Sequence, residues 1–280
     1  MEACFCVICL DDDPGRDAGI VQTVRDHGWC SLRVVGTLDF AYTVGLWHTF
    51  RRPEIVMFGL QGENMQHWLN DFVYLGRDQG WPEPLVPFPG VLGGFETQLR
   101  PVHESWNDSL FGTIHRFYRT FMPVQQLVWP DRNGTWPWEP DATPSSRTRQ
   151  AFAWLPVSGH PEGGWKLVGE MAPGFPFPVG PDAWVLTTRS VLDGTRPVAS
   201  VSNDGNSYDV LDDRGYTAND IVLAFLGELM RRVPSVGECA ELPDGQIATA
   251  NAGGWTHAGL SAKDRELSEW CWKQAEPLNG

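Results

Sequence analysis

The chain has 280 residues and a formal net charge of −14, which is enough length for one large domain or two ordinary ones. An acidic protein repels nucleic acid and anionic membranes, so we expect neither as a partner. The negative charge would attract a basic protein, or it simply keeps the chain in solution. The sequence holds no apolar run long enough for a transmembrane helix, and residues 1–13 lack the basic start and cleavage site of a signal peptide. These features predict a cytoplasmic protein whose six cysteines are reduced thiols.

The first half alternates between helical and strand-like patterns. Apolar residues at helical spacing predict helices over 20–27, 65–75 and 110–118, and Gly28 is a suitable cap for the first. Strands are predicted over 29–35, 40–46, 54–60, 95–102 and 124–129, of which 40–46 and 54–60 are expected to be buried. Proline donates no ladder hydrogen bond, so Arg51-Arg52-Pro53 is expected to form the turn between the second and third strands.

The stretch 139–150, EPDATPSSRTRQ, is rich in proline, serine and threonine and has no apolar period. Such a composition favours a linker or a long surface loop. We therefore predict two domains, 1–140 and 151–280, joined by a linker at 141–150.

The second half begins with strand patterns and continues with helical ones. Strands are predicted over 184–191, 197–202 and 208–211, with the turn sequence NDGN at 203–206. Capping boxes at Thr217/Asp220 and Ser261/Asp264 precede apolar residues at helical spacing, and the clearest predicted helix covers 221–230. Both halves are therefore expected to be α+β, each a mostly antiparallel sheet with helices packed on it.

Several short motifs in the first half occur in the order found in one known family. They are Cys4/Cys6/Cys9, His27-Gly28-Trp29, FAYTVGL at 40–46, Pro53-Glu54, Phe58-Gly59-Leu60, Arg100-Pro101-Val102, QLVWPD at 126–131 and Pro137-Trp138. On these motifs, residues 1–140 resemble the family catalogued as domain of unknown function 4262, which is common in actinobacteria. The resemblance implies a fold for this half and supplies no activity.

The second half carries motifs of a different kind. They are WVLTTRSVLDGTRPVASVSNDG at 184–205, YDVLDD at 208–213, Arg232-Val233-Pro234-Ser235 and, less closely, LPDGQIATANAGGW at 242–255. This half is similar to domain of unknown function 2185, which is grouped with the immunity proteins of polymorphic toxin systems. The resemblance implies a protein that neutralises a toxin by binding it, without chemistry.

Cys4, Cys6 and Cys9 form a C-x-C-x-x-C motif, and thiolates at this spacing can ligate one zinc ion. A closed site needs a fourth ligand, for which Cys30 and His27 are the nearest candidates. The double C-x-x-C pair of many zinc modules is absent, and small soft residues that pack an N-terminal strand would give the same pattern. We therefore predict no metal and no other cofactor, with the three cysteines kept as candidate ligands.

His48 follows the 40–46 strand and precedes Glu54. An imidazole beside a carboxylate can act as a general base, and Arg51 and Arg52 can bind an anionic group. The alternative is that His48 caps a turn. Neither a G-x-S-x-G motif nor a phosphate-binding glycine loop accompanies these residues, so the sequence identifies no catalytic residue.

Two aromatic motifs, Trp129-Pro130-Asp131 and Trp136-Pro137-Trp138, flank an Asn-Gly turn. Indoles held by prolines can form a platform for a ligand or partner, or simply a rigid loop over the sheet. The Tyr42 hydroxyl can reach a pocket, although a buried tyrosine with one hydrogen bond is commoner. The candidate binding residues are Tyr42, His48, Arg51, Arg52, Glu54, Trp129, Asp131, Trp136 and Trp138.

Together, the charge, the motifs and the resemblances favour a cytoplasmic, non-enzymatic binding protein of the immunity type that neutralises a basic toxin by direct binding. The first alternative is an enzyme or small-ligand-binding protein with a His/Glu/Arg pocket in the first half. The second is a zinc-dependent adaptor that uses the N-terminal cysteines.

Overall fold

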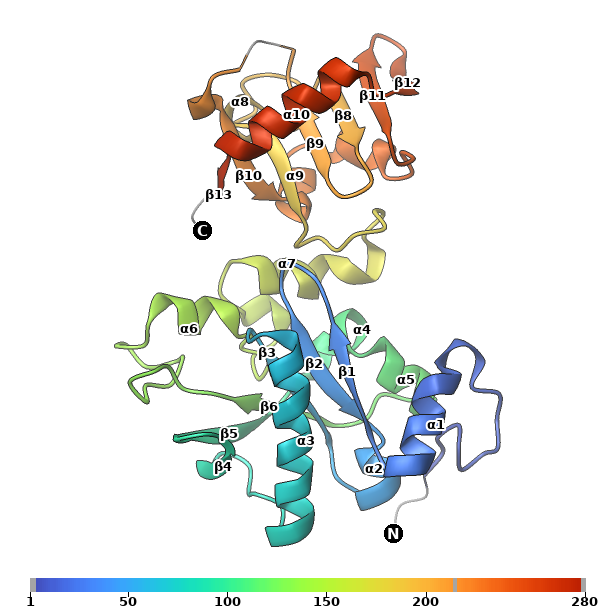
Figure 1. Ribbon diagram of the computed structural model, residues 1–280, viewed down its shortest axis with the longest axis vertical. Coiled ribbons are helices and arrows are strands. Elements are labelled where there is room, and N and C mark those ends of the chain that lie inside the picture. Colours follow the sequence, from blue (N-terminus) through green and yellow to red (C-terminus); the bar gives the residue numbers. More distant parts are fainter. Residues whose placement is uncertain (1–3, 214–215, 278–280) are drawn as a thin grey trace. The chain divides into compact units, whose positions relative to one another are not determined.

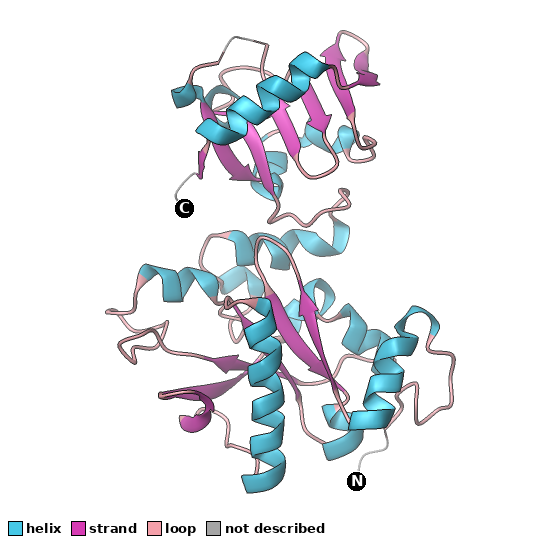
Figure 2. Ribbon diagram, viewed as in Figure 1, coloured by secondary structure: helices cyan, strands magenta, loops and turns pink. Residues whose placement is uncertain are grey.

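A computed structural model describes residues 4–213 and 216–277 and divides the chain into two compact units, Met1–Pro161 and Glu162–Gly280 (Figure 1). Each unit is a sheet covered by helices (Figure 2). The predicted α+β class with mostly antiparallel sheets is confirmed. Within the described residues, no helix combines the length and the apolar character that a membrane crossing needs.

The first unit contains a six-stranded sheet in the order β1-β2-β3-β6-β5-β4. Its strands are β1 (Cys30–Val34), β2 (Phe40–Val44), β3 (Glu54–Phe58), β4 (Phe88–Leu92), β5 (Phe95–Pro101) and β6 (Val124–Val128). Its α-helices are α1 (Ala18–His27), α2 (Leu46–Phe50), α3 (Gly62–Gln79), α4 (Asn107–Leu110), α5 (Gly112–Tyr118) and α6 (Pro144–Arg149). The central neighbours β3 and β6 are parallel, whereas β1-β2, β2-β3 and β5-β6 are antiparallel.

Alternation along β2 and β3 sends side chains to both faces of this sheet. Ala41 and Met57 face one side, where they join the core that α3 completes with Met65, Leu69 and Phe72 (Figure 1). Tyr42 faces the other side and meets Phe111, between α4 and α5, with ring centroids 5.8 Å apart. Both strands are buried along their whole length, which explains why they are mostly apolar, with Thr43 and Glu54 as the polar exceptions.

The link between β2 and β3 differs from the expected turn, because it contains the short helix α2. Gly45 precedes this helix with a φ of 112°, and a Cβ there would lie 2.9 Å from the Gly28 carbonyl oxygen. Only glycine combines that backbone conformation with so close an approach. Arg51, with a φ of 57°, ends the helix.

The segment expected as a linker belongs to the first unit. Residues 144–149 form α6, and the Thr143 side chain accepts a hydrogen bond from the Ser146 N–H. Gln150 is fully buried, and its amide exchanges hydrogen bonds with the backbone of Trp129, at 2.8 and 3.2 Å. The helix α6 and the buried Gln150 thus fix this segment to the first unit although many of its polar residues are exposed, and the units divide after Pro161.

The second unit contains a seven-stranded sheet in the order β12-β11-β8-β9-β7-β10-β13. Its strands are β7 (Trp184–Thr188), β8 (Ser200–Asn203), β9 (Tyr208–Leu211), β10 (Ile221–Phe225), β11 (Gln246–Asn251), β12 (Gly254–Gly259) and β13 (Glu276–Pro277). Its α-helices are α7 (Gly164–Met171), α8 (Arg189–Leu192), α9 (Leu226–Arg232) and α10 (Ala262–Gln274). Cys271 of α10 packs on one face of the sheet with Leu186, Leu211 and Ile221.

The helix predicted over 221–230 is wrong for its first half. Residues 221–225 form β10, which pairs antiparallel with β7, and only the residues from Leu226 onward are helical. Ile221 and Val222 are both buried, on opposite faces of a strand. A continuous apolar run buried on both faces satisfies helical spacing as well, so the periodicity did not separate the two structures.

Candidate metal centre

Three cysteines of the N-terminal segment meet His48 at one point of the first unit. The Sγ atoms of Cys4, Cys6 and Cys9 and a ring nitrogen of His48 all lie within 4.8 Å of one another. His48 Nδ1 is 3.2 Å from Cys6 Sγ and 3.4 Å from Cys9 Sγ. We call these four residues the Cys3His cluster.

A tight turn brings the cysteines together. The Leu10 N–H donates to the Cys6 carbonyl at 3.0 Å, which curls the chain so that Cys9 returns beside Cys6. The Val7 N–H donates to the Phe117 carbonyl at 2.9 Å and fixes the turn to α5. Cys6 and Val7 are buried, whereas Cys9 is exposed. The sequence separation of the cysteines is therefore compatible with three sulfurs that point to one centre.

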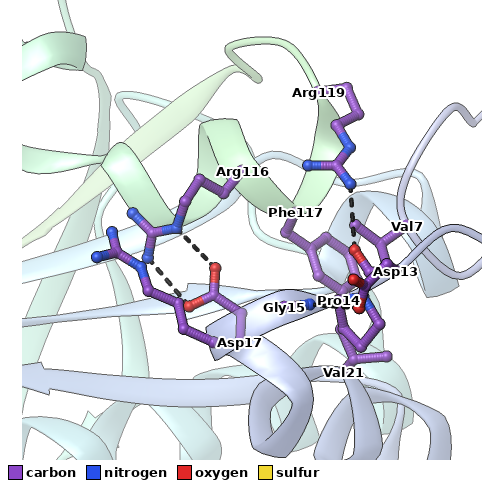
Figure 3. Close-up of a pocket in the computed structure, with 10 residues that line it drawn as sticks. Val7, Asp13, Pro14, Gly15, Asp17, Val21, Arg116, Phe117 and Arg119 are labelled. Carbon is purple, nitrogen blue, oxygen red and sulfur yellow. Dashed lines mark hydrogen bonds and ion pairs between the residues drawn. The ribbon is translucent and has the colours of Figure 1, made fainter.

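Arg116 of α5 and Arg119, the residue that follows this helix, hold the chain after this turn, around a small cavity (Figure 3). Arg116 donates to both carboxylate oxygens of Asp17, at 2.7 and 3.1 Å. Arg119 donates to the Asp12 carboxylate and to the Asp13 carbonyl. Planar guanidinium groups suit such paired contacts, and they place the segment from 12 to 17 against α5.

His48 is placed by the buried carboxylate of Glu54. Glu54 is fully buried, and it accepts hydrogen bonds from the Gly45 N–H at 2.9 Å and the Trp47 N–H at 3.3 Å. It also accepts from the Thr43 hydroxyl at 2.7 Å and from the Tyr118 hydroxyl. The first N–H groups of a helix have no partner within the helix, so Glu54 caps the start of α2 and fixes the backbone that carries His48.

Burial sets the protonation of the cluster in the absence of metal. Burial raises the pKa of the Cys6 thiol to about 12 and also raises the pKa of the Cys9 thiol. Burial, together with the charge of Arg51, lowers the pKa of His48, which favours the neutral imidazole. A neutral imidazole is the form that binds a metal, and a bound cation displaces the thiol protons. The cluster is thus chemically suited to a cation that prefers sulfur and nitrogen.

Neither of the expected fourth ligands belongs to the cluster. Cys30 and His27 instead border a groove next to Trp29 and Asn70. The fourth position belongs to His48, which lies 39 residues after Cys9. The sequence predicted His48, two residues after the FAYTVGL motif, as a general base or a turn cap, and the helix α2 places it beside the cysteines.

The proposed His/Glu/Arg residues surround α2. Glu54 caps its start, and its acceptor oxygens are occupied by the donors named above. Arg51 Nη1 donates to the Trp47 carbonyl at 2.6 Å and to the His48 carbonyl, at the other end of the helix. Arg52 lies over the Trp81 ring, 5.7 Å from its centroid. In this arrangement, Glu54 and Arg51 stabilise the helix that bears His48.

Three other candidate residues have structural contacts. Tyr42 is buried with only 3% of its surface exposed, and burial raises its pKa. Trp129 is also buried, and its indole N–H donates to the Phe58 carbonyl at 2.9 Å. Asp131 accepts the N–H groups of Thr143, Thr135 and Asn133, which lower the pKa of its carboxyl. These contacts close the loop over the sheet.

Trp136 and Trp138 are half-buried and stack with ring centroids 5.2 Å apart and an angle of 3° between their planes. The Arg100 guanidinium lies 3.8 Å from the Trp138 centroid and 4.7 Å from that of Trp154. These four residues form the aromatic–arginine stack of the first unit. Each of its tryptophans is partly exposed.

Fold and site together define an α+β protein with a Cys3His cluster. Residues 23–143 match the model of a family described as Domain of unknown function (DUF4262), which supports the resemblance of the first half. The search of curated proteins and the search of solved structures each gave no match. The match includes His48 but begins after the three cysteines, and the comparisons give no support to the second-half resemblance to domain of unknown function 2185.

Proposed function

We propose that the first unit is a zinc-binding domain in which Cys4, Cys6, Cys9 and His48 hold one structural zinc ion. The observation that carries this proposal is the convergence of four ligand atoms within 4.8 Å. In a tetrahedral site with Zn–S bonds of about 2.3 Å, neighbouring sulfurs lie roughly 3.8 Å apart. The cluster therefore needs only small side-chain movements to bind the ion.

The donor set favours zinc over the common alternatives. Three thiolates and one imidazole suit a borderline-soft cation, whereas magnesium and calcium prefer oxygen ligands. Four protein ligands complete a tetrahedral shell and leave no position for water, which is the arrangement of structural zinc sites. The proposed role is thus to fasten the N-terminal segment to α2, in a cytoplasmic location where the thiols stay reduced.

Metal analysis of the full chain, purified without chelator, tests this proposal. We expect one zinc per chain, and loss of that zinc in the Cys6→Ser and His48→Ala variants. Cys30→Ser removes a thiol of the same unit outside the cluster, so this control should keep its zinc. Cobalt substitution adds a spectroscopic readout, because tetrahedral thiolate coordination gives intense visible absorption. Zinc-free parent protein after reconstitution under reducing conditions would disprove the proposal.

We propose toxin neutralisation by direct binding as a second function of the chain. The half-exposed aromatic–arginine stack supports it, since tryptophan and arginine are the residues most often found at binding hot spots. The net charge of −14 would speed association with a basic toxin. The proposed partner is therefore a basic protein.

Co-expression with toxins from neighbouring genes tests this second proposal. A captured and neutralised toxin supports it, and Trp138→Ala should weaken capture. Trp270→Ala alters an exposed tryptophan of the second unit and serves as the control. Failure of every neighbouring toxin to bind would remove the proposal without affecting the zinc centre.

A further inference from the structure

We propose that the Cys3His cluster is a redox switch, in which a hydroperoxide converts Cys9 and Cys6 to a disulfide and thereby releases zinc. This inference rests on the proposed zinc site and adds its regulation. It follows from how the ligands differ in exposure and from the contact that two of the sulfurs, those of Cys6 and Cys9, share with one nitrogen of His48.

The cysteines of the cluster are unequally protected. Cys6 is fully buried, Cys4 is half-buried and Cys9 is exposed. Oxidation of a thiolate requires both thiolate character and access, and zinc supplies the first by deprotonating its ligands. Cys9 is therefore the position at which a dissolved hydroperoxide meets a zinc-bound thiolate.

Cys6 is placed to complete the reaction. Cys6 Sγ and Cys9 Sγ contact the same atom, His48 Nδ1, at 3.2 and 3.4 Å. Cys6 and Cys9 are three residues apart in the sequence and belong to one tight turn, which the hydrogen bond from the Leu10 N–H to the Cys6 carbonyl closes. A disulfide requires the sulfurs to approach to about 2.05 Å, which side-chain rotation and a small change of the turn can achieve.

The chemistry balances in two steps. The Cys9 thiolate attacks the outer oxygen of the hydroperoxide, so that an S–O bond forms, the O–O bond breaks, and the leaving alkoxide or hydroxide takes a proton. The Cys6 thiolate then attacks the sulfenic sulfur, so that the S–S bond forms, the S–O bond breaks, and hydroxide leaves as water with a second proton. Two electrons pass from sulfur to peroxide, and zinc loses two of its four ligands.

Release of zinc would loosen the turn that carries the cysteines. Among its other contacts are the hydrogen bond from the Val7 N–H to the Phe117 carbonyl, the bond from Arg119 to the Asp13 carbonyl, and the ion pair of Arg119 with Asp12. The two side chains of that pair are 43% and 47% exposed, and exposed ion pairs contribute little to stability. We therefore expect faster amide hydrogen exchange for residues 4–13 after oxidation, while the sheet stays protected.

The experiment starts from full-length protein whose zinc content has been measured. Hydrogen peroxide is added in the presence of a chromogenic zinc chelator, and the product is analysed by intact mass and fragmentation. The expected result is loss of the bound zinc, loss of two hydrogens from the chain, and a bond between Cys6 and Cys9. Dithiothreitol and added zinc should then restore the starting state.

Two variants separate the switch from general oxidation. Cys9→His keeps a fourth ligand but removes the exposed thiolate, so it should retain zinc under peroxide. Cys30→Ser should release zinc as the parent does. If the starting protein holds no zinc, the proposed function fails. If zinc is present and stays bound, or if the zinc-free product lacks the Cys6–Cys9 bond, the switch is wrong and the zinc site stands.

Discussion

The Tyr118 hydroxyl donates a 2.5 Å hydrogen bond to Oε1 of Glu54, and both side chains are buried. The same hydroxyl accepts the backbone N–H of Gly45 at 3.1 Å and that of His48 at 3.3 Å. One phenol thus joins α5, the carboxylate of β3 and the helix that carries the metal ligand. Burial, followed by the charge of Glu54, raises the pKa of Tyr118, so the phenol stays a donor.

Tyr118→Phe should therefore damage both stability and metal affinity. It leaves a buried carboxylate short of one donor, which costs about 1–3 kcal/mol. Loss of a group that orients a metal ligand lowers affinity by roughly 10- to 100-fold. Urea denaturation and zinc competition with a chelator measure the two effects. Tyr74→Phe, which alters an exposed tyrosine of the same unit, should change neither quantity.

Gly45→Ala should destabilise the first unit through the backbone before α2. A Cβ at this position would lie 2.9 Å from both the Gly28 carbonyl oxygen and Val24 Cγ1, on a backbone with a φ of 112°. The strain of such a conformation costs about 1–3 kcal/mol, and the clash adds to it. Gly93→Ala is the control, since a Cβ there meets nothing within 4 Å. Equal urea midpoints for the two variants would contradict this account of α2.

Chelation of zinc should lower the melting temperature of the parent protein. A ligand that binds only the folded state adds about 2.7 kcal/mol when its free concentration is 100 times the Kd. Calorimetry with and without chelator measures the shift. His48→Ala, which lacks a ligand, should melt at the same temperature in both conditions, and a shift in that variant would show that the chelator acts elsewhere.

Stability of the second unit should fall as pH rises through the folded pKa of Asp209. Asp209 is buried, and burial raises its pKa although Ser268 and Trp272 donate to it. Because the pKa of Asp209 is higher in the folded than in the unfolded protein, its neutral carboxyl stabilises the fold. This contribution is complete below the unfolded pKa and is lost above the folded pKa. Asp209→Asn should flatten this part of the pH profile, as followed by urea denaturation with tryptophan fluorescence. Glu241→Gln, at an exposed position, should leave the profile unchanged.

The sequence predicted the α+β class and most elements because strand and helix periodicity is a local signal. The capping box of Ser261 and Asp264 indeed starts α10, and the NDGN turn joins β8 to β9. The Cys3His cluster was harder to predict, because His48 lies 39 residues after Cys9 in the sequence. Contacts of Glu54 and Tyr118 with Gly45, Trp47 and His48 stabilise the helix after β2, and such tertiary contacts leave no local pattern in the sequence.

The parallel pairing of β3 with β6 has a consequence for the order in which the first unit folds. The antiparallel strands β1, β2 and β3 follow one another along the chain, so their contacts close with short loops. Five elements lie between β3 and β6 in the chain, namely α3, β4, β5, α4 and α5. Contacts of long sequence separation form slowly, so we expect the pairing of β6 with β3 to form late. Tyr118 ends α5, the helix before β6, so we expect its contacts with Glu54 and Gly45 to form at this late stage as well. We therefore expect refolding protein to bind zinc after the β1-β2-β3 meander has formed. The rate of zinc binding would then report when β6 pairs with β3.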